Sequence, residues 1–91
     1  MNDEIGRGAR EVFLEALKQA GTECHAAGER TRALIQEGKS GGPTVFKFAN
    51  EFELNEGDKI RNWATEEVLT VIKTRPVSTA GCFNHFEVTV R

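Results

Sequence analysis

The stretch TECHAAGERTRALIQE, residues 22–37, decides the fold class of this chain. Its two halves, 22–27 and 30–37, are strand-like segments that flank Gly28 and Glu29. A two-residue connection that begins with glycine is typical of a type II′ turn between antiparallel strands. The stretch therefore predicts a β-hairpin.

The residues before this hairpin follow a helical period. Apolar residues recur there every three or four positions, as on one face of an amphipathic helix: Ile5, Ala9, Val12, Phe13, Ala16, Leu17 and Ala20. Gly21 follows them, where a helix commonly needs a left-handed cap. The pattern predicts a helix over about residues 4–20, although Gly6 and Gly8 each weaken it by about 1 kcal/mol relative to alanine.

After the hairpin, short apolar segments alternate with breaks rich in Gly, Asn and Pro. We expect strands at 45–48, 59–62, 68–72 and 86–90, and loops or turns at 38–43, 55–58, 62–65 and 75–81. The segment 68–72 is the most apolar of these and is rich in β-branched residues. It is therefore expected to be a central strand that is covered on both faces.

This order predicts a single domain, residues 1–91, of the α+β class that is mainly β. An N-terminal helix is followed by a small antiparallel β-barrel or sandwich at about residues 22–91, because short strands in a chain of this length usually close to hide their edges. The helix should pack across one end or side. The expected core consists of Ala33, Ile35, Phe46, Phe48, Ile60, Val68, Val71, Phe86 and Val88.

The charge and length exclude several function classes. The chain has 91 residues with 12 Lys and Arg against 14 Asp and Glu, a net charge of −2. General nucleic-acid or anionic-membrane binding needs a basic surface, which this balance does not favour. No apolar run reaches the roughly 18 residues of a membrane span, and the first residues hold no apolar signal core. We expect a soluble protein whose small core gains stability from oligomerisation.

Cysteine and histidine occur in two pairs, Cys24 with His25 and Cys82 with His85. Two cysteines and two histidines would suit tetrahedral zinc. However, strand residues that are one or three apart point to opposite faces, so neither pair can chelate one ion from a regular strand; a bulge would be required. We therefore expect reduced cysteines in the core, histidines on solvent-exposed faces and no metal ligand.

No catalytic motif is found. The tripeptide at 38–40, Gly-Lys-Ser, lacks the earlier glycine of a phosphate-binding loop, since that position is Ala33, and no helix follows it. The acidic residues at 51, 53, 56 and 58 lack the spacing of a calcium loop. We expect no catalytic residue and no cofactor, and the protein is not expected to be an enzyme.

The order of turns and apolar positions over residues 9–91 resembles the small head-tail joining (neck, connector or head-completion) proteins of tailed bacteriophages and prophages. The segments that carry the resemblance are LKQAG at 17–21, the hairpin at 22–37, LNEGDKI at 54–60 and VLTV at 68–71. It implies a structural virion protein of the neck, synthesised in the host cytoplasm. It also implies a homo-oligomeric ring that joins the portal or connector to tail proteins, without catalytic residues.

The resemblance implies no membrane partner and no sequence-specific nucleic acid, with at most a passive contact with the DNA channel. We expect the interface to include the loops, the N-terminal segment and the single tryptophan. The candidate residues are Gly38, Lys39, Ser40, Gly41, Gly42, Trp63, Arg75, Ser78 and Thr79. Glycine-rich loops gain order from a partner, and tryptophan is common at interface hot spots. The other interpretation of Trp63 is a cap on the barrel end with its indole N–H in water.

A second function remains open from the sequence. The chain would then be a small β-barrel binding or adaptor domain of a bacterial cell that recognises a peptide or single-stranded nucleic acid. Its six Phe and one Trp suit base stacking, whereas its slight acidic excess opposes contact with phosphates.

Overall fold

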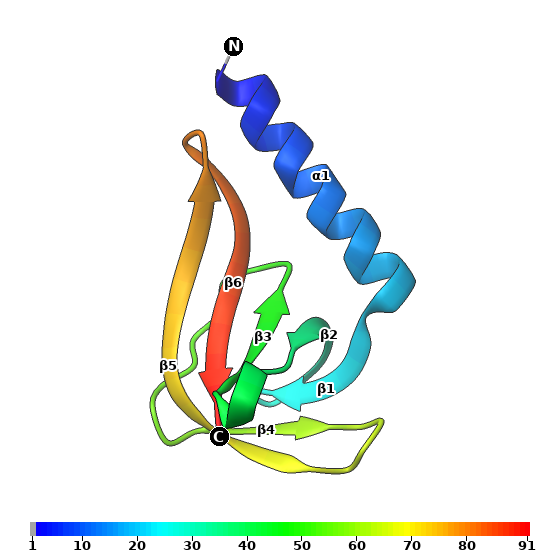
Figure 1. The fold of residues 1–91 in the computed structure, drawn as a ribbon, viewed down its shortest axis with the longest axis vertical. Helices are drawn as coiled ribbons and strands as arrows, with labels where there is room; N and C mark the ends of the chain where they lie inside the picture. Colours follow the sequence, from blue (N-terminus) through cyan, green and yellow to red (C-terminus); the bar gives the residue numbers. More distant parts are fainter. Residues whose placement is uncertain (1) are drawn as a thin grey trace.

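Helix α1 (Asn2–Ala20) precedes a closed barrel of six antiparallel strands (Figure 1). The structure is a computed structural model that describes residues 2–91. The strands are β1 (Thr22–Ala26), β2 (Glu29–Gln36), β3 (Thr44–Phe48), β4 (Lys59–Asn62), β5 (Val68–Thr79) and β6 (Cys82–Val90), with the short 3-10 helix η1 (Lys39–Gly41) between β2 and β3. The predicted α+β, mainly β fold is confirmed, as a barrel.

Each strand is hydrogen-bonded to two neighbours in the order β1-β2-β3-β6-β5-β4, and β4 returns to β1. Within the barrel, closure of this kind covers strand edges that would otherwise attract other chains. β5 and β6 have 12 and 9 residues, more than the strands beside them. Figure 1 shows that their hairpin therefore extends beyond the barrel, toward the N-terminal half of α1.

The β1–β2 hairpin forms one residue earlier than its sequence predicts. Ala26 pairs with Glu29, so the two central turn residues are Ala27 and Gly28, with φ angles of 52° and 75°. Two successive positive φ angles define a type I′ turn rather than the expected type II′. The prediction was wrong because Ala27, which rarely adopts a positive φ, occupies the first turn position.

The prediction of a loop at 75–81 is also wrong, because β5 continues to Thr79 and only Ala80 and Gly81 form the turn. The misleading residue is Pro76, which normally interrupts a strand. Here β5 pairs with β4 only at 68–70, so this half of β5 has a neighbour on one side only, β6. A proline is tolerated at such an edge because its missing N–H removes no ladder bond there.

The barrel interior holds most of the predicted core. Its buried members are Cys24, Ala26, Ala33, Phe46, Phe48, Leu54, Ile60, Val71, Phe86, Val88 and Val90, with Ile35 partly buried against them. Val68 does not belong to the core, since its side chain is 60% exposed. It pairs with Arg61 on the outer face of the barrel, whereas Val71 points inward. β5 is thus covered on one face only.

Helix α1 lies mainly against β6 and also contacts β5 and β2. Phe13 is its buried apolar anchor, with 8% of the residue exposed. The predicted apolar face is only partly correct, because Ile5 and Val12 remain 63% and 71% exposed. No helix in the described part of the chain is long and apolar enough to span a membrane.

Candidate interaction surface

The N-terminal half of α1 and the tip of the β5–β6 hairpin form one unit. Gly6 is buried at their junction. A Cβ atom at this position would lie 2.5 Å from the Thr79 carbonyl oxygen and 2.6 Å from Cys82 Cβ. Only glycine permits so close an approach of the helix backbone to the hairpin.

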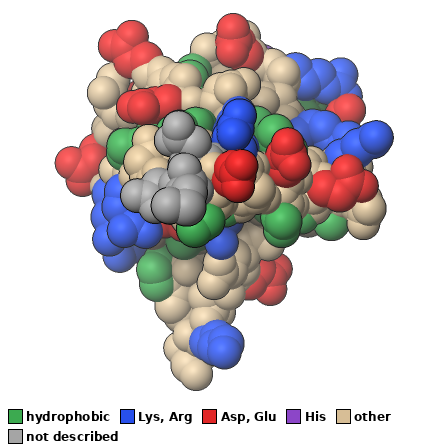
Figure 2. Space-filling view, turned by 90° about the horizontal axis from the view of Figure 1, so that it is seen from above, with side chains coloured by type: hydrophobic (Ala, Val, Ile, Leu, Met, Phe, Trp, Pro, Cys, Tyr) green, Lys and Arg blue, Asp and Glu red, His purple; other side chains and the backbone are tan. Residues whose placement is uncertain are grey.

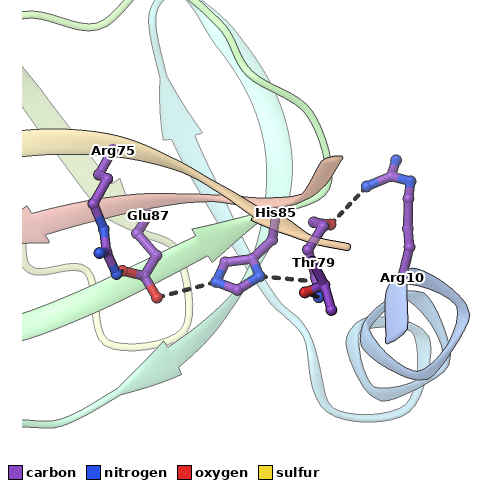
Figure 3. Close-up of polar contacts among 6 residues, drawn as sticks. Arg10, Arg75, Thr79, His85 and Glu87 are labelled. Carbon is purple, nitrogen blue, oxygen red and sulfur yellow. Dashed lines mark hydrogen bonds and ion pairs between the residues drawn. The ribbon is translucent and has the colours of Figure 1, made fainter. Parts of the chain in front are cut away.

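The junction is polar as well as apolar (Figure 3). Six side chains form a polar cluster there: Arg10, Arg75, Thr79, Asn84, His85 and Glu87. Arg10 Nη1 donates to the Asn84 carbonyl oxygen at 2.7 Å, and its guanidinium carbon lies 5.2 Å from the centre of the Phe83 ring. Asn84 Nδ2 donates to Thr79 Oγ1 at 3.0 Å. These contacts join α1 to both strands of the hairpin.

His85 lies at the centre of the polar cluster, with its ring stacked on Phe13 at 4.9 Å between centroids. Its Nδ1 is 3.1 Å from Asn84 Oδ1, and its Nε2 is 3.0 Å from Glu87 Oε2. The bond from Asn84 to Thr79 orients the amide so that its oxygen faces the imidazole. Each ring nitrogen of His85 therefore has a polar side-chain partner.

Glu87 receives hydrogen bonds from two sides. Arg75 Nη2 approaches its second carboxylate oxygen, Oε1, at 2.8 Å. Burial raises the pKa of the Glu87 carboxyl, but the hydrogen bonds and positive charges of Arg75 and His85 outweigh this effect and lower the pKa overall. The cluster thus holds a charged carboxylate at its outer end.

Ile5 and Val12 form an exposed apolar stripe on α1. They are seven residues apart, two helical turns, and so lie on the same side of the helix. The hairpin contacts the neighbouring side, which carries Gly6 and Phe13. Figure 2 looks onto the end of the molecule where α1 begins and shows apolar side chains among acidic and basic ones there.

The structure does not bring the predicted interface residues together. Gly38, Lys39, Ser40, Gly41 and Gly42 lie between β2 and β3, at the end of the barrel near the C-terminus (Figure 1). Gly42 N donates to the Lys39 carbonyl oxygen at 3.0 Å, and Gly38 packs closely on Gly42, so backbone contacts within the loop contribute to its shape.

The other predicted residues lie on two further parts of the barrel. Arg75 and Thr79 belong to the polar cluster, and Ser78 is an exposed residue of the same strand. Trp63 lies in the turn after β4 and is half-buried. Its Nε1 is buried without a hydrogen-bond partner among the described residues, so the expectation of an indole N–H in water is wrong.

The two cysteine–histidine pairs behave differently. Cys24 points into the barrel and His25 points out, as the alternation of a strand predicts. Burial raises the pKa of the Cys24 thiol to about 11, which keeps it protonated. Cys82 and His85, however, both face α1, because Asn84 is an extra residue that shifts the β5–β6 register.

The expectations that His85 faces solvent, and that this pair is divided between two faces, are therefore wrong. Both His85 nitrogens are engaged in hydrogen bonds. Among residues 2–91, no group of three or more His, Cys, Asp or Glu side chains is placed to hold a metal ion.

Sequence reasoning placed Phe13 on the apolar face of the helix, where it is buried, but it did not identify Gly6 or His85 as residues that dock α1. A glycine within a helical pattern is a signal for close approach and was available at Gly6. The contact of Arg10 with Asn84 joins residues 74 positions apart, and no local pattern encodes it. No protein-family model, curated protein or solved structure gives a significant match to this chain.

Proposed function

We propose that this protein is a structural assembly protein that forms a homo-oligomeric ring in the neck of a tailed phage, between the portal or connector and the tail. Two things support the proposal: the order of turns and apolar positions described above, and the apolar stripe of Ile5 and Val12 on α1. The stripe is the observation that carries it.

The stripe is suited to contact with another protein because its position is defined. α1 is held to the hairpin by Gly6, by the Phe13–His85 stack and by the bond from Arg10. Contiguous exposed apolar patches mark protein–protein contacts. Burying an isoleucine or valine contributes about 1.5–3 kcal/mol, so one contact is weak. A ring or a template joins many such contacts at once.

The test compares a stripe variant with a matched control on the same helix. Ile5→Gln/Val12→Gln removes the apolar side chains and keeps good helix formers. Glu4→Gln/Glu11→Gln changes two other exposed positions of α1. Mass photometry and native mass spectrometry would follow oligomers over a range of protein concentrations. In isolation we expect the parent and the control to be monomers or weak oligomers that associate further as the concentration rises, and the stripe variant to associate less.

A second assay tests the location in the virion. Phage heads that lack this protein would be mixed with tails and with each purified variant, and joined particles would be counted by electron microscopy. We expect the parent and the control to restore joining and the stripe variant to fail. A stripe variant that assembles and joins as well as the parent would contradict the proposed contact, and a parent chain that never joins heads to tails would contradict the neck assignment.

A further inference from the structure

The barrel register brings positive charges together on one outer face. His25 of β1 pairs with Arg30 of β2 on one side and with Arg61 of β4 on the other. All three side chains are exposed. Since neighbouring strands lie about 4.8 Å apart, this row extends for about 10 Å across the barrel surface.

The adjoining positions extend the same charge. Arg32 of β2 is outward and pairs with Glu23 of β1, and Lys59 of β4 is outward beside Arg61. We name Arg30, Arg32, Lys59 and Arg61, with His25 among them, the basic face. The basic face holds four cations, whereas the outward positions of β1, β2 and β4 that form it hold only one carboxylate, Glu23. Positive charge is therefore concentrated on this face, although the net charge of the chain is −2.

Trp63 adds planar stacking groups at the edge of the basic face. The guanidinium carbons of Arg61 and Arg30 lie 4.6 Å and 5.5 Å from the centre of its ring. With Arg30 and Glu23, the indole lines a shallow hollow on the barrel surface. Arg30 is paired with Glu23 at 2.6 Å, whereas Arg61 makes no hydrogen bond or ion pair with another described residue. Its N–H groups are available to an anion.

We propose that the basic face binds single-stranded nucleic acid without sequence preference, with phosphates on its arginines and lysine and a base against the Arg61–Trp63 pair. An acidic protein would satisfy the positive charges alone. The guanidinium and indole planes favour a nucleic acid, because bases stack on both groups and each stacked base contributes about 1–3 kcal/mol. This site goes beyond the proposed assembly function and shares no residue with the apolar stripe.

The single tryptophan of the chain makes the binding directly observable. A fluorescein-labelled oligothymidylate of about 15 nucleotides, long enough for a small barrel, serves as the probe. We expect its addition to quench Trp63 emission and its fluorescence anisotropy to rise. The affinity should fall linearly on a log–log plot between about 50 and 200 mM salt, since each neutralised phosphate releases counterions.

Two double variants with equal net charge separate the effect of the basic face on binding from the effect of the total charge of the chain. Arg30→Gln/Arg61→Gln removes two cations from the face, and Lys39→Gln/Lys73→Gln removes two exposed cations elsewhere. We expect the first to weaken binding about tenfold or more and the second to weaken it less than about twofold. Circular dichroism checks that both retain the fold.

Three outcomes would overturn the proposal: no quenching or anisotropy change with the parent, equal loss of affinity in both double variants, or competition by polyglutamate as strong as that by unlabelled oligothymidylate. The last result would identify the face as a site for an acidic protein. The oligomeric state of Arg30→Gln/Arg61→Gln would be measured by mass photometry, as for the stripe variant. If this variant loses nucleic-acid binding but assembles like the parent, the basic face acts independently of the assembly function.

Discussion

At the scale of single residues, Glu87 shows how one side chain can join a helix to a barrel. Its two carboxylate oxygens contact Arg75 of the neighbouring strand and His85 of its own strand, and the His85 ring stacks on Phe13 of α1. A change at Glu87 therefore affects the strand pairing and the helix contact together. The low exposure of its side chain, 20%, keeps these interactions less screened than surface pairs.

The lowered pKa of Glu87 gives a pH-dependent prediction. A carboxyl with a lower pKa in the folded state stabilises the fold above its unfolded pKa, and this contribution is lost as the pH falls through the folded value. Relative to Glu87→Gln, the parent should be more stable by about 1.5–3 kcal/mol near neutral pH, a range typical of hydrogen bonds to charged groups. This difference in stability between the parent and Glu87→Gln should shrink as the pH falls below 4.5, the ordinary pKa of a glutamate carboxyl. Urea unfolding of both proteins from neutral to acidic pH measures it, and a constant difference would contradict this role.

Trp63 and Pro76 illustrate which residues mislead a sequence interpretation. A tryptophan in a turn suggests an exposed indole, yet the guanidinium groups of Arg30 and Arg61 lie beside the Trp63 ring and its Nε1 is buried. A proline suggests a break, yet Pro76 lies in a strand whose outer edge has no partner. For Trp63 one of the two arginines, Arg30, comes from a strand distant in the sequence, and for Pro76 the pairing of β5 with β4 ends at residue 70. Neither fact can be read from the local pattern.

At the scale of elements, the existence and order of the helix and strands could be predicted, because each follows from a local hydrophobic period and a local turn. The helix at about 4–20 and the strand at 59–62 agree with α1 and β4. The face of α1 could not be predicted fully, since the helix has a wide apolar band that includes Ile5 and Val12. The hairpin covers only the part of that band centred on Gly6 and Phe13, and its position depends on tertiary packing.

The two glycines of α1 provide a test of this helix–hairpin contact. Replacing glycine by alanine in a helix normally stabilises it by about 1 kcal/mol. A Cβ atom added at Gly8 would meet no other part of the molecule within 4 Å, so Gly8→Ala should raise the free energy of unfolding by about this amount. At Gly6 the new Cβ would overlap the Thr79 carbonyl and Cys82. Gly6→Ala should therefore lower the stability, by about 1–3 kcal/mol, as overpacking does.

Urea midpoints of the two alanine variants measure the difference, since they carry the same substitution two residues apart. If both variants gain stability equally, the close approach of α1 to the hairpin does not exist in solution. A loss at Gly6 alone would show that the unit presenting the apolar stripe depends on this contact.

At the scale of the whole molecule, a small barrel or sandwich could be predicted from strand number and chain length, but neither the choice between them nor the surfaces that the barrel creates could be predicted. The basic face unites residues of β1, β2 and β4, and only the register places Arg30, His25 and Arg61 in one row. The predicted interface residues likewise lie on three separate parts of the barrel, and their places in the sequence alone do not show this. Closure of the barrel, rather than sequence proximity, decides which side chains share a surface.

The same closure decides which valines support the fold, and this can be measured. Val71 is 2% exposed inside the barrel, whereas Val68, three residues earlier on the same strand, is 60% exposed beside Arg61. Val71→Ala and Phe86→Ala should each lower the free energy of unfolding by about 2–4 kcal/mol, because they leave a cavity in a small core. Val68→Ala should change it by less than about 0.5 kcal/mol, as most surface substitutions do. Equal losses at Val68 and Val71 in urea unfolding would mean that β5 is covered on both faces, and that the inward and outward sides of the barrel are assigned incorrectly.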